Sequence, residues 1–529
     1  MRIVGTIGLE KGEADIRSIV APASLMSVSP LDHESDAQSS RDETALGAFE
    51  HVLVFLLCLT LTVVPLVLHF VNPLLAVATQ LVMASCVVLF FTPYAPLVVV
   101  FALLFQNLFI SMMSGFLVTK SDYNFVRGYN FFTTAVFWLW LFGHYALNWR
   151  SFSRMTNKVM VMGLIGFALI GVYFLLGLTK SPAGAVVYLR NIITPLMVLQ
   201  IFFLATLKRQ IPMVPFFTIL TVIVIVMGYI EMSDRRLWLD LTNGWTLWEF
   251  SNRDAMLNLI ADKSARTTGQ YITGILDLMK VQLFNTPLLG DLRLIILRMN
   301  GPNGHAISYS YALVFLCILM LTNKRWYLAV LMAPLVLMAS AKGAIIMGLL
   351  AFCALIARKL FGAIFAIGSL AFVLVVYVLL GVITGLKIGD FHVLGFMGGV
   401  YNFIDYPFGN GIGDAGNLLT NFDKLDWSAY QHAGRTPVAM ESAVGVLLHQ
   451  MGIASFGLLA IYFWIALQVY KVSFISRVNL HSLACFITMT VVVNGIFQEE
   501  ALFSPLSLGL IMGLNGYILG KFARGGGTL

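Results

Sequence analysis

The chain has 529 residues, of which 59% are hydrophobic and 11% are charged. A soluble globular protein has about 25% charged residues, so this composition excludes a soluble enzyme or binding protein and predicts an all-α polytopic membrane protein. The formal charge of +7 does not indicate nucleic-acid binding, because the Lys and Arg residues cluster in short loops where they set orientation. The five cysteines lie in apolar runs without metal-ligand spacing, so we expect neither disulfides nor a zinc site.

The first 50 residues are the most polar part of the chain. They contain nine acidic and four basic residues and little apolar surface. Such a segment cannot bury enough apolar area to fold alone, so we predict a disordered cytoplasmic tail over 1–50. No positively charged start leads into an apolar core, so the segment is not typical of a signal peptide.

Apolar runs follow one another from His51 to the end of the chain. Those that are long enough to cross about 30 Å of hydrocarbon predict about 14 transmembrane helices, or 12 if the short ones do not cross. They lie near 51–71, 73–91, 95–118, 130–148, 159–178, 191–207, 212–231, 306–322, 326–341, 343–358, 361–386, 450–470, 480–496 and 504–520. With both termini cytoplasmic, the inner segments RSFSRMTNK, LKRQ, NKR, ARK and YKVSFISR and the tail KFARGG each carry at least two Lys or Arg residues, which fits the positive-inside rule.

This topology leaves two long polar segments, 232–305 and 387–449, on the outer face. They separate an N-terminal transmembrane bundle (51–231), a central bundle (306–386) and a C-terminal bundle (450–529). Loops of this length inside a membrane protein are usually functional, so the outer face is where we expect the site.

The first outer loop contains three tryptophans and a stretch with helical apolar spacing. The stretch GQYITGILDLMKVQL predicts a helix that lies on the membrane surface. Trp238, Trp245 and Trp248 suit anchoring at the membrane interface, and the alternative is that they stack on sugar rings.

Two cations lie at outer helix ends. Arg190 lies in VVYLRNIITPLMV between the fifth and sixth predicted crossings, and Lys342 lies where LMASAKGAIIMG must reverse direction. Each cation either extends to lipid headgroups or binds an anion. Because both lie on the face of the long loops, we expect a shared anionic ligand, and a lipid diphosphate is the obvious one in a membrane.

The second outer loop begins with a glycine-rich turn, PFGNGIGDAGN. Gly409, Gly411 and Gly413 permit the positive φ angles and close backbone approach of an anion-binding nest, and Asp414 follows them directly. The alternative is that these glycines serve only the turn. No GK[ST] follows, which excludes a nucleotide P-loop.

The rest of this loop holds groups suited to glycosyl transfer, which needs a base for the acceptor hydroxyl and cations for the departing phosphate. His432 or Glu441 suits the first role and Arg435 the second. If a helix runs from Pro437, Glu441 and His449 share one face at the hydrocarbon boundary. The alternative is that His432 and Arg435 are solvated and that Glu441 is a carboxylate favoured by a helix dipole.

Two further features bear on the chemistry. The loop aspartates lack the close spacing of a DxD pair, which favours chemistry without a metal. Gln498, Glu499 and Glu500 lie at the outer end of the thirteenth crossing, where they either join the same cavity or form a solvated turn.

Four segments of the chain resemble the polysaccharide polymerase and O-antigen ligase family of bacterial membrane glycosyltransferases. They are YLRNIITPLM around Arg190, MNGPNGHAISYSYALVFL, LMASAKGAIIMGLL around Lys342, and PFGNGIGDAGN followed by ESAVGVLLHQMGIASFGLLAIY. They occur in the family's order over about the region 185–470, and Lys342 stands where many relatives have Arg.

The resemblance implies a fold of the large membrane glycosyltransferase class. It also implies action on undecaprenyl-diphosphate-linked glycans, as donor and acceptor, at the outer face of the bacterial inner membrane without metal, cofactor or nucleotide sugar. Arg190 and Lys342 would bind the diphosphate, and His432, Arg435 and Glu441 would serve the acceptor side. Membrane lipid, a chain-length regulator and a flippase are the implied partners.

The expected function is the polymerisation of lipid-linked repeat units into an exopolysaccharide or O-antigen-type polymer. A ligase that transfers glycan to lipid or protein shares the donor half of the site, so the sequence does not separate the two. A secondary transporter is the alternative from another class. Transporters place charges near the middle of the membrane and often have repeated halves, whereas these charges lie at helix ends and the sequence shows no repeat.

Overall fold

The structure is a computed structural model that describes residues 32–248, 250, 276, 279–283, 294–417 and 427–527. The chain forms two compact units, Met1–Val52 and Leu53–Leu529. The described part of the first unit is helical. The second unit is also built of helices, with one small sheet among its described residues, in which β1 (Lys280–Gln282) pairs antiparallel with β2 (Ile295–Leu297).

Ten helices among the described residues are long and apolar enough to cross a membrane. They are α1 (Asp32–Val71), α2 (Pro73–Phe90), α3 (Ala95–Met112), α6 (Arg154–Leu178), α7 (Pro182–Lys208), α8 (Met213–Ser233), α15 (Lys342–Phe361), α16 (Ala363–Ile388), α20 (Ala454–Ser476) and α23 (Leu510–Arg524), the last extended by a π-helical turn at Pro505–Gly509. The protein is therefore an all-α polytopic membrane protein, as the composition predicts.

Four further predicted crossings are helices that do not meet the same standard. They are α5 (Tyr129–Leu147), α13 (Ala306–Thr322), α14 (Trp326–Ala339) and α21 (Asn479–Asn494). The shortest, α14, has 14 residues and spans about 21 Å at 1.5 Å per residue, less than the hydrocarbon layer. Every predicted crossing thus coincides with a helix, although only ten have the length and composition to cross alone.

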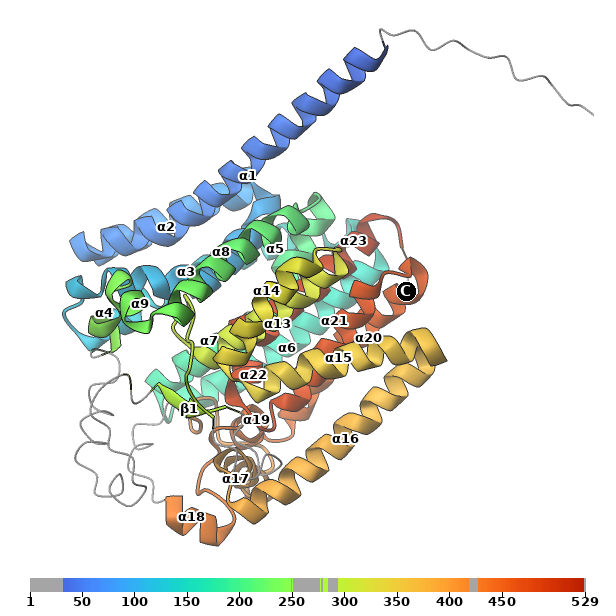
Figure 1. Cartoon of the computed structure of the whole chain (residues 1–529). Helices are drawn as coiled ribbons and strands as arrows, with labels where there is room; N and C mark the ends of the chain where they lie inside the picture. The colour runs from blue at the N-terminus through green and yellow to red at the C-terminus, as the bar shows by residue number, and fades with distance from the viewer. Residues whose placement is uncertain are drawn as a thin grey trace, which may run out of the picture. The chain divides into compact units, whose positions relative to one another are not determined.

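Helix α7 lies at the centre of the second unit, packed against α3, α5, α6 and α23 (Figure 1). Its residues from Thr194 to Thr206 are all buried, which is expected for a helix that is apolar on every side. Helix α23 approaches it closely through glycines, since a Cβ at Gly516 would collide with the carbonyl oxygen of Leu199. Small residues at such contacts let two membrane helices pack backbone to backbone.

Short helices connect the long ones. They are α4 (Lys120–Val126), α9 (Arg235–Leu241), α17 (Phe391–Asp405), α18 (Trp427–Ala433), α19 (Ala443–Met451) and α22 (Glu499–Phe503). Helix α19 packs against α17 and α22, and α22 contacts α7 and α13. Figure 1 shows α17, α19 and α22 in one region of the second unit, with α19 packed against the other two, and this region carries most of the polar residues singled out in the sequence.

The structure departs from the sequence interpretation in three places. Helix α1 already begins at Asp32, inside the segment predicted to be disordered, because the residues up to Leu46 include no Pro or Gly and each adds one hydrogen bond to an existing helix. Most of GQYITGILDLMKVQL lies outside the described residues, but Lys280–Gln282 form strand β1, so the predicted surface helix does not include them. Trp238 is buried in the hydrophobic core, so it is not an interfacial anchor.

Candidate functional site

Helix α22 joins parts of the bundle that are far apart in the sequence. Gln498, just before α22, accepts a hydrogen bond from the hydroxyl of Tyr311 on α13 at 2.9 Å. Asn494, at the end of α21, donates to the carbonyl oxygen of Gly343 at 2.7 Å, in the first turn of α15. The start of α15 and the first turns of α13 therefore meet at α22.

Glu499 is the buried carboxyl of α22. It accepts hydrogen bonds from the hydroxyl of Tyr188 on α7 at 2.8 Å and from the backbone N–H of Asn417 at 3.2 Å. Burial raises the pKa of Glu499 to about 8, and Glu500 and Glu441 act in the same direction, while the two hydrogen bonds oppose them. Glu499 is therefore mostly protonated at neutral pH, and it links α7 to the glycine-rich segment.

Arg190 lies two residues after Tyr188 on α7 and is part-buried. Arg127, at the end of α4, is close enough to Arg190 for the two positive charges to repel each other. Among the described residues, neither guanidinium has a carboxylate partner, and Arg127 only lies over the Tyr123 ring, 5.2 Å from its centre. Two part-buried cations that repel each other and lack a carboxylate partner among the described residues favour a bound anion. This pair is therefore a candidate anion-binding site.

The loop before α13 is held in place by Glu231 at the end of α8. Glu231 forms a buried ion pair with Arg235 and accepts the backbone N–H groups of Asn300 and Gly301 at 2.9 and 3.0 Å. Arg235 also donates to the carbonyl oxygen of Arg298 at 2.8 Å. The buried carboxylate of Glu231 with its three donors, and the bond from Arg235 to Arg298, fix the loop that carries the next two basic residues.

Those residues, Arg298 and His305, face Glu500. The Nε of Arg298 donates to the carbonyl oxygen of Ala339 at 3.0 Å, and Nε2 of His305 lies 3.8 Å from Oε1 of Glu500. Burial lowers the pKa values of both Arg298 and His305, and Glu500 partly offsets this. The second carboxylate oxygen of Glu500 is buried without a hydrogen-bond partner among the described residues.

Glu441 lies outside any helix, which contradicts the prediction that it shares a helical face with His449 from Pro437. Helix α19 begins only at Ala443, because Ser442 caps it by accepting the N–H of Gly445 at 3.1 Å. Glu441 has a φ of 57°, a left-handed conformation that is uncommon for a residue other than glycine. Such strain is often found at functional sites.

The carboxylate of Glu441 has a histidine neighbour. Oε2 of Glu441 lies 3.4 Å from Nδ1 of His392. The backbone N–H of Glu441 donates to the side-chain oxygen of Asn417 at 2.8 Å. Burial raises the pKa of Glu441, His392 opposes the shift, and Glu500 adds to it. With 24% of its side chain exposed, Glu441 remains accessible while holding its proton more tightly than a solvated glutamate.

Lys342 opens α15 directly after a turn in which Ser340 has a φ of 51°. The predicted reversal of the chain at this point is confirmed. The lysine is exposed and is attracted by Asp390, which caps α17 by accepting the N–H of His392 at 3.0 Å. Lys342 thus lies at the start of α15, where Asn494 binds Gly343, and Arg190 lies on α7, which contacts α22.

His432 and Arg435 lie apart from this cluster. His432 is exposed at the end of α18, and Arg435 is exposed over the ring of Tyr401, 4.2 Å from its centre. The described contacts of these two residues do not include Glu441 or Arg190. Their predicted acceptor-side role stays a prediction.

The glycine-rich turn is bent as predicted, and its glycines are packed against other backbone. Gly409, Gly411, Gly413 and Gly416 have φ between 74° and 103°. A Cβ at Gly411 would lie 2.7 Å from the nitrogen of Gly177 on α6. The N–H groups of Gly409, Gly411 and Gly416 donate to carbonyl oxygens within the protein, so they are already occupied and cannot bind an anion.

Asp414, also in this turn, is part-exposed between two basic residues. Its Oδ2 lies 3.8 Å from Nζ of Lys180 and 3.7 Å from Nε2 of His449. Asp414 therefore ties the turn to the loop before α7 and to α19.

The cluster around α22 can bind an anion at its arginines and move a proton at Glu441 or Glu499. Sequence reasoning missed Arg127, Arg298 and His305, although the first ends a short polar helix on the predicted outer face and the other two flank the MNGPNG segment. Among the described residues, no three His, Cys, Asp or Glu side chains are grouped as metal ligands.

No family model matches this chain, and neither a curated protein nor a solved structure is similar to it.

Proposed function

We propose that this protein transfers a glycan from a polyprenyl diphosphate to a second lipid-linked glycan, and so polymerises repeat units at the outer face of a bacterial inner membrane. The observation that carries the proposal is the pair Arg127 and Arg190, which have no carboxylate partner among the described residues, together with the raised pKa values of Glu441 and Glu499. Tyr188, two residues before Arg190, donates to Glu499. A membrane-anchored diphosphate is the anion that such a site at the end of a helix bundle can recruit.

The arginines bind the donor diphosphate. Guanidinium groups bind phosphate oxygens through paired, charge-assisted hydrogen bonds. Arg190 and Arg127 together offset most of the diphosphate charge, and Arg298, which Glu500 attracts, stabilises the leaving group. Lys342, which Asp390 attracts, supplies a point charge at the start of α15.

Glu441 takes the proton in this scheme. The acceptor hydroxyl oxygen forms a bond to the anomeric carbon of the donor, the bond from that carbon to the phosphate oxygen breaks, and the diphosphate leaves with the electron pair. Glu441 accepts the hydroxyl proton, and His392 stabilises its charged form before transfer. A carboxylate with a raised pKa is a stronger base than a solvated one. His432 and Arg435 bind the acceptor glycan.

The proposal includes fourteen crossings with both termini cytoplasmic. The helices α5, α13, α14 and α21 then cross as parts of a bundle, where neighbouring helices compensate for their limited length or apolarity. The segments 232–305 and 387–449 form the two outer loops, and α22 lies on their side of the membrane.

Two alternative functions, a ligase and a secondary transporter, are supported to different degrees. A ligase would use the same arginines for the donor and another acceptor. A secondary transporter is less favoured, because the ion pairs around Glu231, Asp414, Glu441 and Glu500 lie at helix ends and in loops and not at mid-depth.

Lipid-linked intermediates test the proposal. A strain that lacks this protein should accumulate lipid-linked single repeats and lose long polymer, as shown by mass spectrometry of extracted lipids and by gel analysis of the glycan. The wild-type gene should restore the polymer, and Glu441→Gln should not, at equal protein level. Lys359→Gln at the other end of α15 is the matched control and should restore it fully. Normal polymer in the deletion strain would refute the function, and accumulation of finished lipid-linked polymer would indicate the ligase.

A further inference from the structure

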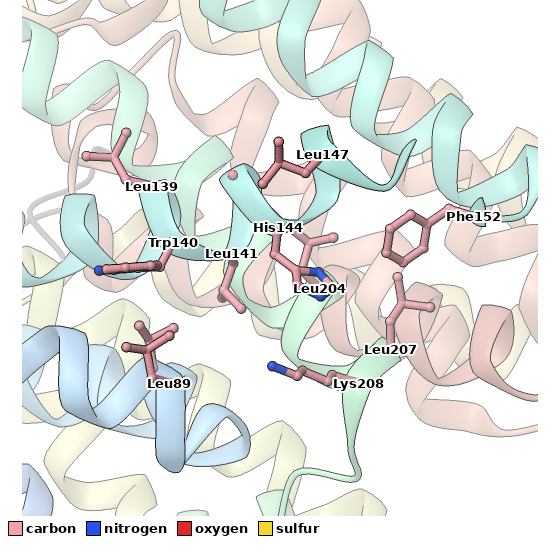
Figure 2. Close-up of a pocket in the computed structure, with 12 residues that line it drawn as sticks. Leu89, Leu139, Trp140, Leu141, His144, Leu147, Phe152, Leu204, Leu207 and Lys208 are labelled. Carbon is pink, nitrogen blue, oxygen red and sulfur yellow. The ribbon is translucent and has the colours of Figure 1, made fainter. Parts of the chain in front are cut away.

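A cavity of about 480 Å³ opens between the ends of α2, α5 and α7. It lies near Lys208, the last residue of α7, whereas Arg190 is in the first turns of that helix. Figure 2 shows His144 and Lys208 among apolar side chains such as Leu89, Trp140 and Leu204. The volume is in the range of sites that hold a small molecule, roughly 300–1,000 Å³.

The walls of this cavity face the hydrocarbon. Leu89 is 50% exposed, Trp140 is 46% exposed and Leu147 is 87% exposed, so the opening is lateral and apolar. The indole N–H of Trp140 donates to the hydroxyl of Ser85 on α2 at 2.9 Å, which fixes one wall. A cavity that is open to lipid and lined in this way fits an acyl chain.

The charge around the cavity is of one sign. Arg150, Arg154 and Lys158 lie in the connection from α5 to α6 and the first turns of α6, and Arg209 follows Lys208. Between His51 and Ile230 the sequence contains a single acidic residue, Asp122.

Asp122 does not neutralise these cations. It forms the N-terminal capping box of α4 with Thr119, just before the start of α5, and the cavity lies at the far end of α5. The basic residues around the cavity therefore have no acidic neighbour in this part of the chain, and an anion from the surroundings is favoured there.

We propose that this cavity binds an anionic phospholipid, with one acyl chain inside and its phosphate held by Lys208 and His144. The ammonium of Lys208 lies 3.5 Å from the hydroxyl of Thr92, which leaves two of its hydrogens for phosphate oxygens. His144 can donate through one ring nitrogen in either tautomer. The cations of this end identify it as cytoplasmic by the positive-inside rule, so the lipid belongs to the inner leaflet.

The site is independent of the glycan chemistry at α22. Its occupant fills the space between the ends of α2, α5 and α7 and supplies a negative charge to Lys208. We expect it to stay bound when bulk lipid is removed.

Native mass spectrometry of the purified full-length protein tests this proposal. Phosphatidylglycerol or phosphatidylcholine with identical acyl chains is added to delipidated protein in detergent. Lys208→Gln should weaken phosphatidylglycerol binding about fivefold, the usual effect of one basic residue on an anionic lipid. Lys359→Gln, which removes an exposed cation at the end of α15 that does not line the cavity, should leave binding unchanged.

A second variant tests the acyl chain. A side chain at Gly143 would enter open space in the cavity, so Gly143→Phe should fill it and abolish binding of the phospholipid. Gly171→Phe is the control, because Gly171 on α6 also has open space around it but does not line the cavity. Equal binding of the two lipids, or full phosphatidylglycerol binding by either Lys208→Gln or Gly143→Phe, would overturn the proposal.

Discussion

Replacement of Arg190 by alanine separates function from folding. Its guanidinium is repelled by Arg127 and has no carboxylate partner among the described residues. Removal of an unpaired, part-buried cation costs the folded protein little, so the melting temperature should be unchanged or higher. Function should be lost, because the same group is proposed to bind the donor diphosphate.

The size of the loss follows from the contact that disappears. A hydrogen bond to a charged group contributes about 1.5–3 kcal/mol, and about 1.4 kcal/mol corresponds to a factor of ten. Arg190→Ala should therefore lower kcat/KM for consumption of lipid-linked repeats by about 10- to 150-fold. Arg190→Lys should retain part of the activity, since it keeps the charge and loses the paired geometry.

The assay uses membranes from a deletion strain that carries each variant at matched protein level. Consumption of extracted lipid-linked repeats is followed by mass spectrometry, and thermal unfolding is measured on the purified variants. Arg154→Ala, at the opposite end of the antiparallel pair α6 and α7, should behave as wild type. Wild-type turnover with Arg190→Ala would refute the diphosphate site, and a large drop in melting temperature would show that Arg190 is structural.

Three further predictions concern the carboxyls and the glycine-rich turn. The pKa of Glu499 is raised from 4.5 to about 8, so its contribution to stability is present below pH 4.5 and is lost as pH rises to about 8. The melting temperature of the wild type should therefore fall between pH 5 and 9, and Glu499→Gln should reduce this fall. Because His392 lowers the pKa of Glu441, His392→Ala should move the acid limb of the pH–rate profile to higher pH, and an unmoved limb would exclude Glu441 as the base. Gly411→Ala places a Cβ against the backbone of α6 and should lower the free energy of unfolding by about 2–5 kcal/mol, the sum of left-handed strain and overpacking. Gly434→Ala, whose Cβ meets open space at a similar positive φ, should cost about 1–2 kcal/mol, and equal losses would show that packing does not matter at Gly411.

The sequence identified some residues of the candidate site and missed others. Lys342 at a chain reversal and the bent glycine turn were predicted from local patterns, and the structure has them there. Arg190, predicted between two crossings, lies inside α7, which already begins at Pro182. The condition under which Glu441 and His449 share a helical face, a helix from Pro437, is not met, because Ser442 caps a helix that begins only at Ala443.

The sequence by itself determined the class of this protein, the order of its apolar helices and the turns between them. These depend on composition and on neighbours a few residues away, which is why they can be read without coordinates. Only the tertiary structure decided which polar groups meet. Tyr188 and Glu499 are 311 positions apart and share a hydrogen bond, and Arg127 and Arg190, from α4 and α7, are close enough to repel each other. Long-range packing sets such contacts, and the pKa values and unpaired charges at α22 follow from it.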